Sequence, residues 1–230
     1  MTMLPPINGR VLRERNKAIR YDALFFDFDG VLVESAEIKT QAFRALYAEY
    51  GDDVIAEVVA HHGEHEGISR VEKIHYCHKE FLGEDLSEAD LGMWAVQYSN
   101  AVVDAVVDCP GVPGSINLLK RNLGARKMFV VSGTPQTELR DVVERRGMTH
   151  FFDAVCGSPR RKEPIVEELL AQFDLAANRC LFIGDAMTDY RAAQATGLDF
   201  IGRVGAGTDS PFPEGTLVAT DLTELEQQEG

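Results

Sequence analysis

Two carboxylates stand one residue apart at the end of an apolar run near the start of the chain. Asp27 and Asp29 follow the apolar run 23–26, and Gly30 comes directly after them. Successive residues of a strand point to opposite faces, so we expect the two acids to project to the same side. Two acids placed in this way repel each other unless a cation or a shared proton intervenes. The pair therefore predicts a hard metal ion and an acid/base or nucleophilic role.

Polar residues also follow three later apolar runs that we interpret as strands. The carboxyl ends of parallel strands meet at one edge of a sheet, so we expect these residues to converge on the first pair. They supply further carboxylates, a hydroxyl at the start of a helix and a lysine, which are the parts needed to hold a phosphate beside Mg²⁺. The residues are Ser132, Gly133, Lys162, Asp185 and Asp189.

Each motif taken alone also has a simpler interpretation. Asp-x-Asp-Gly occurs in calcium loops, but those need a closing glutamate at a fixed position, and Glu34 comes too early. Ser132 or Asp185 could serve only as a helix cap, and Lys162 could be a solvated lysine. A histidine-rich segment could hold a structural zinc ion, although solvated or capping roles are commoner. Its histidines are His61, His62, His65, His75 and His78.

The pattern of secondary structure changes at the Pro- and Gly-rich segment 109–114. Before it, between 35 and 108, apolar residues recur only at helical spacing. After it, short apolar runs alternate with amphipathic helices, which predicts an α/β fold with a doubly wound parallel sheet covered on both faces. The expected strands are 23–27, 127–132, 151–156, 179–184 and 200–204. The expected helices of this part are 115–122, 135–146, 164–173 and 189–196.

The predicted organisation has three parts: an N-terminal extension at 1–20, an α/β core at 21–34 and 110–230, and an inserted all-helical domain at 35–109. An insert directly after the carboxyl end of a strand lies over the crevice where such folds bind ligands, so it can act as a lid. We expect 205–215 to form a loop and the acidic tail 222–230 to fray.

Composition narrows the classes of partner. The net charge of −14 argues against nucleic acid and anionic membranes, because both require an extended cationic surface. No apolar run approaches the roughly 20 residues of a membrane span, and the N-terminus has no secretory signal pattern. The four cysteines form no CxxC motif and indicate a reducing cytoplasm without structural disulfides. We expect a monomer or a homodimer.

Four motifs in this order resemble those of the haloacid dehalogenase (HAD) superfamily. The motifs are Asp27-x-Asp29-Gly30-Val31, Ser132, Lys162 and Gly184-Asp185-x-x-x-Asp189. The helical insert between the first two resembles the C1-type cap of phosphoglycolate-phosphatase-like and β-phosphoglucomutase-like members. The resemblance covers about 21–204, and the second acid of the first motif points to phosphoryl transfer rather than dehalogenation.

The resemblance implies a role for each residue. Asp27 would be the nucleophile that forms an aspartyl phosphate. Asp29 would protonate the leaving alcohol and then activate the hydrolytic water. The phosphate-binding residues would be Ser132, Gly133 and Lys162. The Mg²⁺ ligands would be Asp27, Asp29 through its carbonyl, Asp185 and, directly or through water, Asp189.

The insert adds candidates for substrate binding. The sequence 66–70 resembles the specificity loop of such caps, so Arg70 is the first candidate, and Lys73 follows one helical turn later. Lys39 stands where β-phosphoglucomutase-like members carry a histidine, which weakens the mutase alternative. Glu163 separates Lys162 from a proline where relatives commonly show Lys-Pro, so Arg160 or Arg161 could share the phosphate-binding role.

The resemblance implies a Mg²⁺-dependent phosphatase that acts on a small phosphorylated metabolite, either phosphoglycolate or a sugar phosphate. One alternative is a sugar phosphomutase of the β-phosphoglucomutase type. Another is a non-catalytic sensor of phosphorylated metabolites. The intact pair Asp27 and Asp29 argues against the sensor, since a pure binder needs neither a nucleophile nor an acid.

Overall fold

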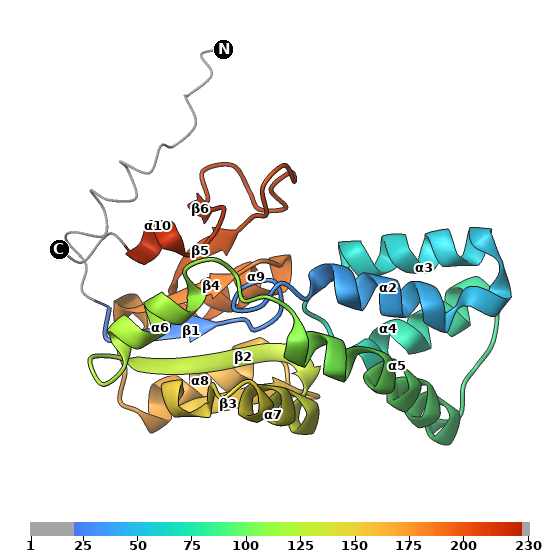
Figure 1. Ribbon diagram of the computed structural model, residues 1–230, viewed down its shortest axis with the longest axis horizontal. Helices are drawn as coiled ribbons and strands as arrows, with labels where there is room; N and C mark the ends of the chain where they lie inside the picture. The colour runs from blue at the N-terminus through green and yellow to red at the C-terminus, as the bar shows by residue number, and fades with distance from the viewer. Residues whose placement is uncertain (1–20, 227–230) are drawn as a thin grey trace, which may run out of the picture.

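A six-stranded parallel sheet forms the centre of the molecule (Figure 1). The computed structural model describes residues 21–226, so the predicted N-terminal extension at 1–20 lies outside the described residues. The strand order is β3-β2-β1-β4-β5-β6, and every neighbouring pair is parallel. This confirms the doubly wound parallel sheet. The strands are β1 (Ala23–Phe26), β2 (Lys127–Pro135), β3 (Ala154–Ser158), β4 (Cys180–Gly184), β5 (Asp199–Arg203) and β6 (Val218–Ala219).

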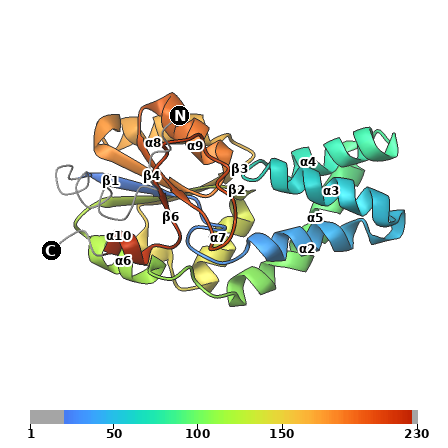
Figure 2. The same cartoon turned by 90° about the horizontal axis from the view of Figure 1, so that it is seen from above.

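Helices cover both faces of this sheet, which explains why its central strands are continuously apolar. In β1, Leu24 and Phe26 belong to the hydrophobic cluster of one face, and Ala23 and Phe25 to that of the other. The first face carries α6 (Ser115–Asn122), α7 (Gln136–Arg145) and α10 (Thr223–Glu226). The second carries α8 (Lys162–Gln172) and α9 (Met187–Thr196), as Figure 2 shows. From β1 the chain adds strands first on one side of the sheet (β2, β3) and then on the other (β4, β5, β6). A ligand crevice is expected at the carboxyl ends of β1 and β4, where the two halves of the sheet meet.

The remaining helices form a separate layer beyond that end of the sheet (Figures 1 and 2). They are α2 (Ala36–Leu46), α3 (Asp52–Glu64), α4 (Arg70–Cys77) and α5 (Glu88–Asp108), with a 3-10 turn at Ala48–Tyr50 and a π turn at His78–Leu82. We call this layer the cap. Its buried side chains continue the hydrophobic cluster of the first face of the sheet, and they include Phe43, Tyr47, Val58, Ile74 and Tyr98. The domain boundaries at 35 and 109 remain predictions, and both fall in the connections that join the cap to the sheet.

Arginines fix the two connections between cap and sheet. Nη1 of Arg146, which directly follows α7, donates to the carbonyls of Val106, Val107 and Cys109 at 2.7, 2.7 and 2.9 Å. These carbonyls lie at the end of α5, where a helix leaves its last carbonyls without backbone partners. On the other connection, Nη2 of Arg203 donates to Glu34 at 2.7 Å.

The predicted element boundaries differ from the structure at several points. β2 runs to Pro135 rather than 132, and α8 begins at Lys162 rather than 164. The predicted fraying of the tail is wrong for 222–226, because Leu222 and Leu225 are buried in the cluster that includes α6. Residues 227–230 lie outside the described part. Within the described residues, no helix combines the length and apolarity that crossing a membrane requires.

Candidate active site

Asp27 lies directly after the central strand β1, and the residue is only 4% exposed. Its Oδ2 accepts a hydrogen bond from Nζ of Lys162 at 2.8 Å. Its Oδ1 accepts one from the backbone N–H of Phe28 at 2.6 Å. Two donors therefore fix the orientation of a carboxylate at the end of a buried strand, as an aligned nucleophile requires.

Lys162 is the first residue of α8, and it is buried between two acids. Its Nζ lies 2.8 Å from Asp27 and 2.5 Å from Asp189. Burial opposes the charge on Lys162, but Asp189 and Asp27 outweigh burial and raise its pKa, so the amine stays protonated. The neighbouring Arg160 instead pairs with Glu168 at 2.5 Å on the surface. The structure therefore brings Lys162 into the site despite the intervening Glu163.

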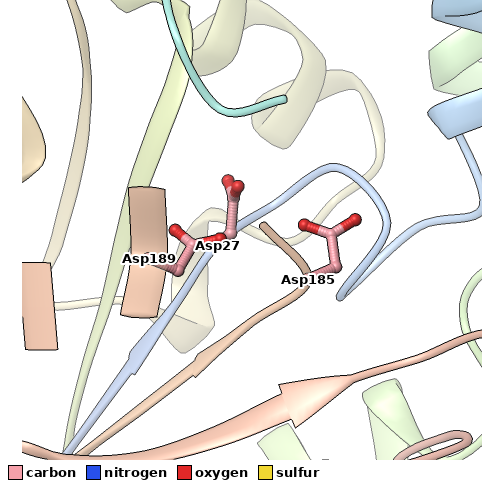
Figure 3. Close-up of side chains that lie close together, drawn as sticks. All are labelled: Asp27, Asp185 and Asp189. Atoms are coloured by element: carbon pink, nitrogen blue, oxygen red, sulfur yellow. The ribbon is translucent and has the colours of Figure 1, made fainter. Parts of the chain in front are cut away.

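Three carboxylates form a tight cluster in the site. Oxygens of Asp27, Asp185 and Asp189 lie within 4.8 Å of one another, and Figure 3 shows the three side chains gathered in one place. Burial and the charge of Asp27 raise the pKa of Asp189 to about 7, and they raise that of Asp185 well above its usual range. One lysine does not balance this negative charge. Clustered carboxylate oxygens are the donor set that a hard divalent cation prefers, so the site fits such an ion.

The turn after β1 is shaped to admit one of these acids. Gly30 has φ of +72°, which L side chains rarely adopt. A Cβ at this position would lie 1.8 Å from Oδ2 of Asp185. Only glycine therefore lets the turn pass so close to the carboxylate cluster.

No metal-ligating cluster involves the cap histidines within the described residues. His78 is buried, and its Nδ1 lies 2.9 Å from Oε2 of Glu84. Its ring packs edge-on against Trp94, with centroids 4.4 Å apart. His78 therefore has a packing role in the cap core.

Asp29 is surrounded by donors. Its Oδ1 accepts a hydrogen bond from Ser35 at 2.6 Å, and its Oδ2 accepts one from Oγ1 of Thr134 at 2.8 Å and pairs with Nζ of Lys39. Burial raises the pKa of Asp29, but the charge of Lys39 and these hydrogen bonds outweigh it, so the pKa is lowered. The carboxylate is therefore held in its ionised form. To donate one, it must first lose part of the influence of Lys39.

The loop after β2 meets a loop of the cap. Oγ of Ser132 lies 3.5 Å from Oδ2 of Asp29, and a Cβ at Gly133 would lie 2.5 Å from the carbonyl oxygen of Gly67. On the other side of this cap loop, Oγ1 of Thr188 donates to the carbonyl of residue 66 at 3.2 Å. The cap therefore rests directly on the core, over the carboxylates.

The cap and the core enclose a cavity of about 570 Å³, part of which is open to solvent. The core lines it with Asp27, Asp29, Ser132, Gly133, Thr134 and Asp185. The cap lines it with Ala36, Lys39, Phe43, His62, Glu66, Gly67, Ile68, Arg70, Lys73 and Tyr98. Lys162 joins this site through its hydrogen bond to Asp27, and Asp189 joins it through its bond to Lys162.

Arg70 lines the cavity, but its charge is already paired. Its guanidinium forms a two-point ion pair with Glu138 of α7, with Nη1 2.7 Å from Oε2. Nη1 also donates to Ser99 at 2.7 Å, and the guanidinium carbon lies 4.5 Å from the ring centroid of Tyr98. Because Glu138 belongs to the core, this pair joins the cap to the core.

Lys73 is buried in the cap wall of the cavity, with 3% of its surface exposed. Its Nζ lies 2.9 Å from Nδ1 of His62 and 3.3 Å from the His62 carbonyl oxygen. Burial, with help from the charges of Lys39 and Arg70, lowers the pKa of Lys73 to about 7. Burial and Lys73 in turn lower the pKa of His62 to about 3, so that imidazole is neutral and can accept the bond.

Several residues of the site were not predicted from the sequence. Thr134 could have been found, because β2 continues to Pro135 and its period of two places Thr134 on the side of Ser132. Ser35 lies at the start of the helical insert, and no local motif marks it as a partner of Asp29. Glu138 depends on a contact with a residue 68 positions away, for which the sequence carries no local signal.

The chain is similar to known proteins over most of its length. The family model described as haloacid dehalogenase-like hydrolase matches residues 21–197. A 5′-nucleotidase of Pseudomonas aeruginosa is 28% identical over 219 residues, which cover 85% of this chain and 88% of that protein. A phosphoglycolate phosphatase of Rhodobacter capsulatus is 29% identical over 194 residues, which cover 78% of this chain and 82% of that protein.

Solved structures share the fold. The crystal structure of β-phosphoglucomutase from Clostridium difficile superposes with a TM-score of 0.71 at 21% sequence identity. The superposition covers 89% of this chain and 93% of that one. It therefore extends over both the sheet and the cap.

Proposed function

This chain belongs to the haloacid dehalogenase-like hydrolase family, and on that premise we propose that it is a Mg²⁺-dependent phosphatase of a small phosphorylated metabolite. We propose phosphoglycolate or a sugar phosphate as the substrate and an aspartyl phosphate as the intermediate. One observation carries the proposal. A buried carboxylate, Asp27, lines the cavity between cap and core within a carboxylate cluster, and a second acid, Asp29, lines the same cavity.

In the first half of the reaction, an oxygen of Asp27 attacks phosphorus. A bond forms between Asp27 and phosphorus while the bond from phosphorus to the alcohol oxygen breaks. The hydroxyl of Ser132, the N–H of Gly133 and the amine of Lys162 would hold the other phosphoryl oxygens. Asp27, Asp185 and Asp189, together with the Asp29 carbonyl, would hold Mg²⁺, which supplies the positive charge that lets a carboxylate approach a phosphate.

Asp29 has a different task in each half. It gives a proton to the leaving alcohol. It then takes a proton from the water that attacks phosphorus, while the bond from phosphorus to Asp27 breaks and phosphate is released. The contacts from Lys39, Ser35 and Thr134 favour its ionised form, which suits the second half. For the first half, Asp29 must hold a proton, so Lys39 has to move away or pair with the substrate instead.

The cap completes the site by covering it. Its loop rests on Gly133 and Thr188, so the reacting groups are shielded from bulk water. The cap must open for exchange of substrate and product. Of the two cap-to-core ion pairs at the site, Arg70 with Glu138 and Lys39 with Asp29, the second links cap movement directly to the acid/base group.

A steady-state assay with Mg²⁺ tests the proposal. We expect phosphate release from p-nitrophenyl phosphate and faster release from one member of a panel of phosphorylated metabolites. An Asp29→Asn variant should lose most of this activity, whereas an Asp209→Asn variant, altered in an exposed loop, should keep it. An isomerised sugar phosphate in place of free phosphate would identify a phosphomutase. Tight metabolite binding without turnover would identify a sensor.

A further inference from the structure

The cap wall of the cavity carries three cations, and two of them are paired with acids. Lys39 forms an ion pair with Asp29, and Arg70 forms one with Glu138. Among residues 21–226, no carboxylate lies within ion-pair distance of the third cation, Lys73. Lys73 is therefore the cation of the cavity wall that has no ion-pair partner among the described residues.

The immediate contacts of Lys73 do not satisfy it. An ammonium group has three donors, and His62 supplies two acceptors, Nδ1 at 2.9 Å and the carbonyl oxygen at 3.3 Å. The ring of Phe43 lies 5.8 Å from Nζ and adds only a weak attraction. Glu66 acts on Lys73 at longer range without forming an ion pair. One donor of a nearly inaccessible amine is therefore without an acceptor among the described residues.

Burying an unpaired charge is costly, and among the described residues no acid pairs with Lys73, so the longer-range attraction of Glu66 offsets only part of that cost. The burial of Lys73 and the cations beside it lower its pKa to about 7, which is the physical expression of the missing counter-charge. Such a group is stabilised when a ligand brings an anion to it. Lys73 lines the same cavity as Asp27, so a ligand in that cavity can meet both.

The positions of Asp27 and Lys73 determine which chemical groups the ligand must carry. A phosphoryl group that reacts with Asp27 lies at the core side of the cavity, so the alcohol part of the substrate extends toward the cap. Building on the proposed function, we propose that Lys73 binds a second anionic group, a carboxylate or a phosphate, on that alcohol part. The enzyme then selects phosphomonoesters that carry this second charge over those with a neutral alcohol part.

A matched pair of substrates tests this inference. 2-Phosphoglycolate and 2-hydroxyethyl phosphate differ only in a carboxylate and a hydroxymethyl group, and ethylene glycol bisphosphate offers a phosphate at that place. The wild type should favour at least one charged ester by about 10- to 100-fold in kcat/KM, as expected for a charged hydrogen bond. The ester that is favoured tells which anion Lys73 binds.

Lys73→Met should remove this preference. We expect its kcat/KM for the favoured charged ester to fall about 10- to 100-fold, with the value for 2-hydroxyethyl phosphate changed less than about threefold. Lys79→Met, at an exposed cap position, should leave all the values as in the wild type. Circular dichroism and thermal melting report whether each variant is folded.

Other outcomes overturn the inference. If the wild type hydrolyses all three esters equally well, or if Lys73→Met slows them all by the same factor, Lys73 does not bind a second anion. Hydrolysis of p-nitrophenyl phosphate in either case shows that the proposed function still holds. If no phosphate ester is hydrolysed, the proposed function fails. Calorimetric titration of an Asp27→Asn variant with the same esters then decides on Lys73, because equal affinity for the charged and neutral esters overturns the inference without turnover.

Discussion

Replacing Lys73 by methionine should change the stability of the protein in a pH-dependent way. Methionine keeps most of the side-chain volume but removes the charge. The lowering of the Lys73 pKa from 10.5 to about 7, at about 1.36 kcal/mol per unit, corresponds to a destabilisation on the order of 5 kcal/mol. The variant also leaves the two acceptors of His62 without a donor, which costs about 1–3 kcal/mol.

The proton bound by Lys73 determines how the stability difference between the wild type and Lys73→Met changes with pH. Between pH 7 and 10.5 the unfolded chain holds the Lys73 proton more tightly than the folded chain does, so the wild type gains stability relative to the variant as the pH rises. Below about pH 7 the cost of the buried charge is fully present, and Lys73→Met should be the more stable by about 2–4 kcal/mol. Near pH 10 most of that cost is gone, and the lost hydrogen bonds should make the variant equal to the wild type or less stable.

Urea unfolding at pH 6, 8 and 10 measures this difference. Trp94 is the only tryptophan and lies in α5 of the cap, so its fluorescence reports on the cap. Taking the difference between two proteins at each pH cancels the titration of all other groups that the substitution leaves unchanged. Lys79→Met serves as the exposed control. A constant difference between Lys73→Met and the wild type at all three pH values would refute the reasoning.

Three further substitutions test other parts of the site. Lys39→Met removes the charge that lowers the pKa of Asp29, so the limb of the pH–rate profile due to Asp29 should move to higher pH. An unmoved limb would contradict the pairing of Lys39 with Asp29. Asp185→Asn relieves carboxylate repulsion, so without metal it should melt at a higher temperature than the wild type. Mg²⁺ should raise the melting temperature of the wild type only, and an equal rise in both proteins would exclude Asp185 as a ligand. Arg146→Met removes three hydrogen bonds at the end of α5, so urea unfolding should show a loss of about 3 kcal/mol in the free energy of unfolding. A loss below about 0.5 kcal/mol would show that the cap connection does not depend on Arg146.

The sequence was sufficient to predict the sheet and the strand ends because these depend on local patterns. Continuous apolar runs mark strands covered on both faces, and a carboxylate such as Asp27 directly after such a run marks an edge of the sheet. The ordered spacing of the motifs then indicated that Asp27, Asp185 and Lys162 meet. The structure places these side chains in one site.

The contacts of the cap could not be predicted in the same way. Arg70 was expected at the substrate, and it lines the cavity, but its partner Glu138 comes from α7, and no local pattern pairs these residues. Whether Lys73 is exposed or buried depends on how α4 packs on α3, because a lysine on an amphipathic helix is usually solvated. The strand β6 has only two residues, too few for a periodic signal.

The most direct test of the central claim is to locate the phosphoryl group on the enzyme. The protein is mixed with Mg²⁺ and its best phosphate ester, quenched in acid within one turnover, and digested for mass spectrometry. We expect a phosphorylated peptide with the modification on Asp27, and neither this peptide nor phosphate release with Asp27→Asn. Phosphate release by Asp27→Asn at the wild-type rate would contradict the account.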